Sequence, residues 1–354
     1  MESNNLKMEY PPVTSYPIVA NMFSILWANK EFTIPWIADH FIQLRVSKEP
    51  LDFYISGNFF DYMIYHNVPI YMICPFIKVQ VVDDSILHIY NRLTDFVEYS
   101  INNNNYVSIA LNNFYFPCSP HYGKNHYMHP TFINGYDKNK KQIFVSDFYT
   151  NQRYIRNIVS YAQLNDSFEY KVVEKDFIGE PMFEYCNLLR YNQFNYATDL
   201  NLIKRSLSDY LNSKNSFDRS NYDYKNKDVE FYYGLEYYER ILEYYLHSQS
   251  CEGSDSIPLD FRFIFILCDH KKLMSIRLEH LYKMRTINSK DFLQLSAKCV
   301  ELLKQTTKIL MLSIKYTATR NASIFTSILR FLEALKKFDA EVCTEILNVL
   351  QRKN

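Results

Sequence analysis

The sequence predicts an α+β fold, with strands concentrated in the first half and helices in the second. Short apolar runs separated by Asn, Lys, Gly and Pro alternate with loops between residues 51 and 173. After about residue 185, apolar residues recur at helical spacing over long stretches. We therefore expect a strand-rich domain at residues 1–180 and a mainly α-helical domain or lid at residues 181–354.

The first half begins with a helical pattern over residues 18–46, for which Pro17 is a start signal and Pro35 an interruption. The segment 136–140 is typical of a hairpin turn between two strands. The remaining patterns predict strands at 51–55, 68–73, 76–82, 106–115, 129–135, 142–148 and 168–173, and helices at 83–99 and 152–164.

The second half is expected to be helical throughout, apart from a polar stretch at 212–226 that we expect to be a mobile loop. The helical patterns cover residues 199–211, 229–246, 258–284, 289–317, 322–338 and 340–350.

Composition excludes several classes of protein. The 354 residues carry 39 Lys+Arg and 39 Asp+Glu, and this balance argues against a nucleic-acid binder that works by bulk charge. None of the 6 glycines lies in a phosphate-binding loop of the Rossmann or P-loop type. The start of the chain does not resemble a secretory signal, and the most apolar run, 261–268, is too short to cross a membrane. We expect a soluble, cytoplasmic protein.

Charge is divided unevenly along the chain. Residues 257–354 contain 17 Lys+Arg and 9 Asp+Glu, so residues 1–256 contain 22 and 30. The simpler explanation is solvated helix faces. The alternative is a docking face for an acidic partner, because complementary charge steers association.

The residues best suited to catalysis lie between residues 116 and 148. His129 begins one apolar strand, and Asp147 ends the next. If the two strands pair as a hairpin, the carboxylate can bind one imidazole nitrogen and leave the other to deprotonate a nucleophile. This pattern predicts two members of a catalytic triad.

The arrangement of His129, an apolar strand, a Gly135-Tyr136-Asp137 turn, a second apolar strand and Asp147 resembles the papain-like superfamily in its bacterial forms. It looks most like the cysteine-protease homologues that act as transacylases in thiotemplated peptide biosynthesis, relatives of the butirosin-type acyltransferases. The resemblance covers residues 115–148 and implies that an N-terminal helix packs on an antiparallel sheet. It also implies that His129 is the general base and that Asp147 orients it.

In that family the nucleophile is a Cys at the start of the first helix, where the helix dipole lowers the pKa of the thiol. This chain has no Cys before Cys74, and the corresponding position falls near Ala20. We favour an engineered Cys-to-Ala replacement, since the His and Asp remain; a natural pseudoenzyme and a nucleophile position elsewhere in the chain stay open.

Other interpretations of the same segment remain open. Cys118 or Cys74 could be the thiolate, although the seven cysteines include no C-x-x-C pair and are most simply reduced thiols. The spacing of the possible zinc ligands matches no strong signature, and the three histidines could be ordinary loop residues. Nothing in the sequence selects Asn21 or Gln43 as oxyanion donors. The zinc ligands considered are Cys118, His121, His126 and His129.

The resemblance implies an acyltransferase that forms an amide. The acyl group would arrive as a thioester on the phosphopantetheine of an acyl or peptidyl carrier protein, pass to the Cys and then to an amine acceptor. No cofactor of the chain's own, no metal, no nucleic acid and no membrane are expected. A peptidase or amidase, or a catalytically inactive papain-like binding protein, is the alternative.

Overall fold

In a computed structural model, the chain forms two compact units that are each assembled from separate stretches of sequence. The first contains Met1–Lys30 and Pro69–Phe194, and the second contains Glu31–Val68 and Asn195–Asn354. The expected boundary near residue 180 therefore differs from the observed crossing at residues 194 and 195, and residues 31–68 join the helical half. The structure describes residues 2–48, 59–60, 71, 74–149, 153–172, 174–175, 181–182, 185–216, 231–250 and 259–352.

The first unit is built on an antiparallel sheet. Within the described residues its strands follow the order β4-β11-β5-β6-β7-β8, and the short β1 pairs with β6. The sequence expectation of an antiparallel sheet is confirmed. The strands are β1 (Ser3–Asn5), β4 (Ile77–Asp83), β5 (Tyr106–Asn112), β6 (Met128–Asp137), β7 (Gln142–Phe148), β8 (Tyr154–Ser160) and β11 (Tyr185–Tyr191).

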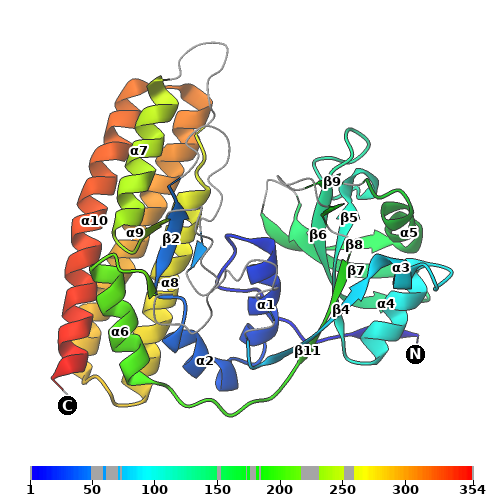
Figure 1. Cartoon of the computed structure of the whole chain (residues 1–354), viewed down its shortest axis with the longest axis horizontal. Coiled ribbons are helices and arrows are strands. Elements are labelled where there is room, and N and C mark those ends of the chain that lie inside the picture. The colour runs from blue at the N-terminus through cyan, green and yellow to red at the C-terminus, as the bar shows by residue number, and fades with distance from the viewer. Residues whose placement is uncertain are drawn as a thin grey trace. The chain divides into compact units, whose positions relative to one another are not determined.

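Helices cover both faces of this sheet (Figure 1). Helix α1 (Pro17–Trp27) contacts β6 and β7 from one side. On the other side lie α3 (Asp84–Leu87), α4 (Leu93–Asn102) and α5 (Tyr161–Glu169), of which α4 and α5 contribute to an apolar core with Ile133, Val145 and Val159. Because cross-strand partners share a face, this core identifies which sheet residues point toward α4 and α5.

The hairpin of β6 and β7 has the expected antiparallel register, with Phe132 opposite Ser146 and Ile133 opposite Val145. A bulge follows between Ile133 and Gly135. The N-terminal strand pairs at this glycine, where Asn5 lies opposite Gly135. A Cβ on Gly135 would lie 2.7 Å from the carbonyl oxygen of Asn4, so the absence of a side chain allows this close approach.

The second unit is mainly helical, as the sequence predicts. It contains α2 (Lys30–Asp39), α6 (Leu200–Leu211), α7 (Glu236–Ser250), α8 (Arg262–Lys283), α9 (Ser289–Thr319) and α10 (Ala322–Gln351). Helix α9 packs against both α8 and α10, and α6 and α7 pack against α10. Three short strands, β2 (Leu44–Ser47), β3 (Phe59–Phe60) and β12 (Phe231–Tyr233), pair with one another.

Several expected elements are wrong. The expected helix at 152–164 is strand β8 followed by α5, and the chain changes at Ser160, which caps α5 in a capping box with Gln163. Of the expected strand at 168–173, residues 168–172 are the end of α5 and the coil after it, and residue 173 lies outside the described residues. The expected helix at 18–46 divides into α1, α2 and β2, with Pro35 inside α2.

Other boundaries also move. The expected helix at 83–99 divides into α3 and α4. The start of the expected helix at 229–246 is strand β12, and the two helices expected at 322–350 are the single helix α10. The expected strand at 51–55, all of the expected strand at 68–73 except residue 71, and most of the loop at 212–226 lie outside the described residues. A further short pair, β9 (Glu174–Lys175) with β10 (Pro181–Met182), was not expected.

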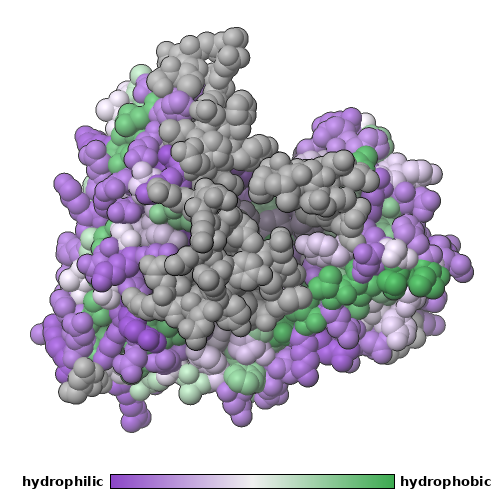
Figure 2. All heavy atoms as spheres, in the orientation of Figure 1, coloured by the Kyte–Doolittle hydropathy of each residue, from purple (hydrophilic) through white to green (hydrophobic). Residues whose placement is uncertain are grey.

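The surface of the first unit has an exposed apolar strip. Figure 2 shows it over β4 and α3, where Val81 and Ile86 are exposed together with Ile89. Among the described helices of the chain, none combines the length and the apolar character required to cross a membrane.

Candidate functional site

The structure brings His129 and Asp147 together at the end of the β6–β7 hairpin. His129 Nδ1 lies 2.6 Å from Asp147 Oδ2. His129 pairs with Leu111 across the β5–β6 ladder. In the β6–β7 ladder Ile133 lies opposite Val145, and His129 and Asp147 are each an even number of residues away from this pair. The two side chains therefore leave the same face of the sheet one diagonal position apart, which is within reach of a hydrogen bond.

The burial of this pair is asymmetric. The Asp147 side chain is fully buried, whereas 18% of the His129 side chain is exposed. The second carboxylate oxygen of Asp147 accepts a hydrogen bond from the Phe148 amide at 2.6 Å. A buried carboxylate held in this way accepts the Nδ1 proton of His129 and leaves Nε2 as the basic nitrogen. The pair can therefore act as a general base.

A stack of aromatic rings lies beside His129. The ring of Tyr127 stacks on His129 at 5.5 Å between centroids, and His121 also stacks on Tyr127, at 4.2 Å. Asn125 Nδ2 lies 2.9 Å from His121 Nδ1. Tyr127 precedes His129 by two residues, so it points to the same side of the extended chain. This alternation was visible in the sequence, but it was not used there to identify Tyr127.

The same loop does not gather its histidines into a metal site. His126 is hydrogen-bonded to Asn112 Nδ2 at 2.9 Å and stacks on Phe114. His121 instead joins the stack with Tyr127. Across the part of the chain that the structure describes, no three or more His, Cys, Asp or Glu side chains are placed to hold a metal ion. The described geometry therefore gives no support to the zinc interpretation.

The two cysteines considered as alternative nucleophiles are poorly activated. Burial raises the pKa of the Cys118 thiol to about 12, and the nearby Asp147 carboxylate adds to the effect. Burial likewise raises the pKa of Cys74 to about 12. Neither thiol is ionised at neutral pH, so either would depend on a base to remove its proton. Cys118 packs against the apolar core that Tyr149 also joins.

Ala20 lies inside α1 and is fully buried. Its amide donates to the Tyr16 carbonyl within the helix, and its own carbonyl accepts from the Ser24 hydroxyl. Tyr154, whose side chain leaves the sheet on the face opposite to that of Asp147, donates to Asn21 Oδ1 at 2.8 Å. The structure therefore places Ala20 in a helix over the opposite face of the sheet from the His129–Asp147 pair.

The two polar residues considered as oxyanion donors, Gln43 and Asn21, also form contacts away from the His129–Asp147 pair. Gln43 belongs to the second unit, where its amide donates to the Lys214 carbonyl and to Ser216. Asn21 is buried beside Tyr154. Helix α1 starts at Pro17 with Tyr16 as its N-cap. Ser15 therefore lies just before the N-terminus of the helix, where free backbone amides point outward. The sequence alone had not singled out Ser15.

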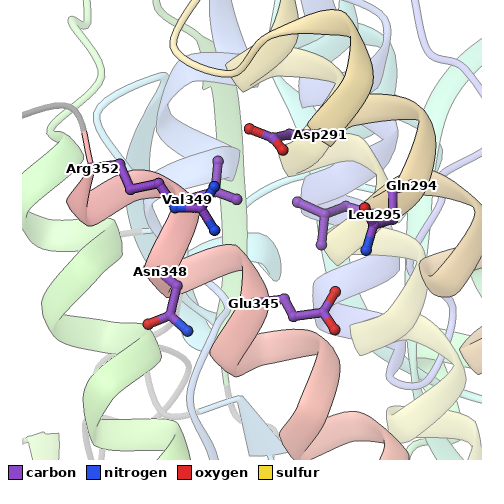
Figure 3. A pocket seen from close by; sticks show the side chains of 7 residues that line it. All are labelled: Asp291, Gln294, Leu295, Glu345, Asn348, Val349 and Arg352. Carbon is purple, nitrogen blue, oxygen red and sulfur yellow. The ribbon is translucent and has the colours of Figure 1, made fainter.

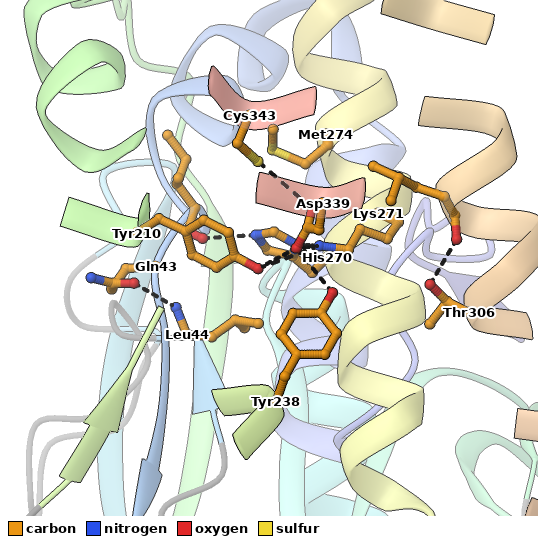
Figure 4. Close-up of polar contacts among 12 residues, drawn as sticks. Gln43, Leu44, Tyr210, Tyr238, His270, Lys271, Met274, Thr306, Asp339 and Cys343 are labelled. Carbon is orange, nitrogen blue, oxygen red and sulfur yellow. Dashed lines mark hydrogen bonds and ion pairs between the residues drawn. The ribbon is translucent and has the colours of Figure 1, made fainter. Parts of the chain in front are cut away.

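A second polar cluster lies in the core of the helical unit (Figure 4). Asp339 Oδ2 accepts hydrogen bonds from Lys271, Tyr210 and Tyr238 at 2.5, 2.6 and 2.9 Å. Lys271 also donates to His270 Nδ1 at 2.9 Å, and His270 Nε2 donates to the Ile42 carbonyl. All five side chains are fully buried. Because no ligand can reach them, we interpret the cluster as structural.

The helical unit also has a shallow pocket of about 130 Å³ between the start of α9 and the end of α10 (Figure 3). Its wall carries charges of both signs, including Asp291, Glu345 and Arg352. No nucleophile or histidine lines it, so it does not compete with the His129–Asp147 pair as a catalytic site.

In comparisons with known proteins, no family model and no curated sequence matches the chain.

Proposed function

We propose that the chain is an acyltransferase of papain-like type that forms an amide from a carrier-protein thioester. The observation that carries the proposal is the 2.6 Å contact between His129 and the fully buried Asp147. A structural histidine does not need a buried carboxylate that is itself held by a backbone amide, as Asp147 is by Phe148. A general base does, because the carboxylate stabilises the imidazolium that forms when the base takes a proton.

The proposed reaction has two steps. In the first, the nucleophile gives its proton to His129 Nε2 and attacks the thioester carbonyl, and the pantetheine thiol leaves with that proton. In the second, an amine attacks the acyl-enzyme, and His129 takes the amine proton and gives it to the nucleophile, which leaves as the amide forms. Thioester exchange is nearly neutral in energy and aminolysis runs downhill, so neither step needs a nucleotide.

The family resemblance implied a Cys nucleophile at position 20, but Ala20 is fully buried in α1 over the sheet face opposite to His129 and Asp147. A thiol there could not pass its proton to His129, so we do not propose this position. Two residues offer alternatives. Ser15 precedes the start of α1, where a helix dipole stabilises negative charge. Cys118 lies near Asp147, and burial together with that carboxylate raises the pKa of its thiol. Single variants at the three positions distinguish these assignments.

The decisive experiment compares the unmodified chain with Ala20→Cys, each with and without Ser15→Ala or Cys118→Ala. Each protein is incubated with an acyl thioester and a primary amine, and amide, free acid and acyl-enzyme are measured by mass spectrometry. We expect the unmodified chain to form the acyl-enzyme and the amide, and Ala20→Cys to carry no acyl group on residue 20, because that position faces away from the His129–Asp147 pair. Activity of the unmodified chain that Ser15→Ala or Cys118→Ala abolishes would assign the nucleophile to that residue.

The same experiment tests the alternatives. Free acid without amide would replace the transferase proposal by a hydrolase, and cleavage of a peptide substrate would make that hydrolase a peptidase. A thiol-reactive electrophile provides a simpler test of activation. If Cys at position 20 reacts no faster than an unperturbed thiol and no variant forms an acyl-enzyme, the chain is a binding protein on a papain-like scaffold.

A further inference from the structure

We propose that the exposed face of α9 is the docking site for an acidic helix of the carrier protein. The inference rests on the proposed function for the identity of the partner. The surface itself is recognised from the residues of α9 and of the neighbouring part of α10.

The outward face of α9 repeats every seven residues. Leu293, Val300, Thr307 and Ile314 form one row, and Ala297, Lys304, Met311 and Ala318 form the second. Leu293, Val300 and Met311 are 68%, 60% and 56% exposed, and Ile314 is 40% exposed. Two rows offset by three and four residues are the pattern with which one helix receives another. We call these rows the α9 seam.

Positive charge borders the α9 seam on one side. Lys304 lies within it, with a side chain that is 79% exposed and a long 3.9 Å contact to Glu301. Lys308 and Lys315 follow at the next turns on the side of α10. Lys308 Nζ lies 4.0 Å from the ring centroid of Phe331 on α10.

The charge continues onto α10. The Arg330 guanidinium lies 5.2 Å from the same Phe331 ring. Residues 302–337 contain seven Lys+Arg and a single acidic residue, Glu333. Of these, Lys336 pairs with Glu239 on α7, and Glu301 lies 3.9 Å from Lys304. Lys308, Lys315 and Arg330 still give the border of the seam a positive surplus, although the whole chain has a formal net charge of zero.

The exposed apolar rows of the α9 seam and the basic residues beside them fit a protein helix that carries acidic residues along one edge. A nucleic acid would gain nothing from exposed Val300, Met311 and Ile314. A helix that lies in a membrane surface keeps its apolar face free of charge, whereas Lys304 stands between Val300 and Met311 in the seam. An amphipathic helix with Asp or Glu along one edge satisfies both the apolar rows and the lysines.

The test measures binding directly, so it does not depend on the nucleophile. A fluorescently labelled, acidic holo-acyl carrier protein is titrated with the full chain at low and high salt, and its anisotropy gives the Kd. We expect binding that weakens with salt. Lys304→Glu/Lys308→Glu and Met311→Ser/Ile314→Ser should each weaken it at least about tenfold. The control Lys78→Glu/Lys140→Glu makes the same change in net charge on the first unit and should leave the Kd unchanged.

Three outcomes would overturn the proposal. The first is no binding of the carrier protein by the unmodified chain, and the second is an equal effect of the α9 and control variants on the Kd. The third is that the α9 variants bind the carrier protein normally but lose binding to phosphatidylglycerol vesicles or to RNA. Failure of the proposed function is measured separately. An acyl thioester of N-acetylcysteamine has no protein to dock, so its turnover should be the same with and without the α9 substitutions.

Discussion

At the scale of single residues, Asp147 has the most specific role because it fixes the orientation of His129. Asn in its place would keep the size of the side chain but lose the charge that stabilises the imidazolium. We expect Asp147→Asn to lower kcat on the order of 10³- to 10⁴-fold in the catalytically active form, as the corresponding change does in Ser-His-Asp enzymes.

His129→Gln should lower kcat by a similar factor, and the double variant should be little worse than either single one, since the two residues act as a unit. Asp137→Asn is the matched control, because Asp137 lies at the turn end of the same hairpin and binds the Lys140 amide. Full activity of Asp147→Asn would remove the dyad from the mechanism.

Tyr127 is expected to position His129 through its ring, because the two rings stack at 5.5 Å. Tyr127→Ala should lower kcat by about ten- to a hundredfold, since small errors in the placement of a base are costly. Tyr127→Phe keeps the ring and should retain activity. A readout specific to positioning is the pH profile of kcat/KM, which should shift in Tyr127→Ala and not in Tyr127→Phe. Equal losses in both variants would instead assign the role to the hydroxyl.

At the scale of elements, Gly135 determines whether β1 can pair with β6. A methyl group there would meet the Asn4 carbonyl oxygen at 2.7 Å and the Phe144 ring at 2.8 Å. We expect Gly135→Ala to lower the free energy of unfolding by about 1–3 kcal/mol, as overpacking in a core does. Urea unfolding measures this change. Gly123→Ala is a useful comparison, because a Cβ there meets nothing within 4 Å and only its positive φ opposes the change. A smaller loss for Gly135→Ala than for Gly123→Ala would contradict the expectation.

The elements also show what the sequence could predict and what it could not. The strands that carry His129 and Asp147 were predicted well because alternation and a hairpin turn are local signals. Strand β8 was mistaken for a helix because Ile155, Ile158 and Val159 also fit a helical spacing; the local cue to its end was the capping box at Ser160. The partners of Asp339 could not be foreseen, since Lys271 is 68 residues away and Tyr210 is 129 residues away.

At the scale of the whole molecule, the buried cluster around Asp339 ties helices α6, α7, α8 and α10 of the second unit together. Burial raises the pKa of Asp339, but the Lys271 ammonium and the other donors outweigh it and leave the pKa below its usual value. We expect Lys271→Met to lower the free energy of unfolding by about 3–5 kcal/mol, because it leaves a buried carboxylate without its counter-ion.

The matched experiment is a double-mutant cycle with Asp339→Leu. The double variant Lys271→Met/Asp339→Leu should be more stable than the sum of the single losses predicts, since it removes both charges. The fluorescence of the buried Trp36 reports on the second unit in a Trp27→Phe background, because the chain has only these 2 Trp residues. Additive losses would show that Lys271 and Asp339 are not energetically coupled.

The second unit should also lose stability in mild acid. Burial lowers the pKa of His40 to about 4 and that of His270 well below 6.5, so both bind protons in the unfolded chain before they do so in the folded one. Burial raises the pKa of Asp39 to about 6, which has the opposite effect. Between pH 5.5 and 4.5 the unfolded chain therefore carries about two protons on His40 and His270, whereas the folded chain carries about one proton, on Asp39. The net difference of one proton predicts that the free energy of unfolding falls by about 1.4 kcal/mol over that pH unit.

Asp39→Asn removes the opposing proton and should double this fall to about 2.7 kcal/mol, while the amide oxygen still accepts from Tyr196. Urea titrations of Trp36 fluorescence at the two pH values measure both slopes, and an equal slope in the variant would show that Asp39 is ionised in the folded protein throughout this range.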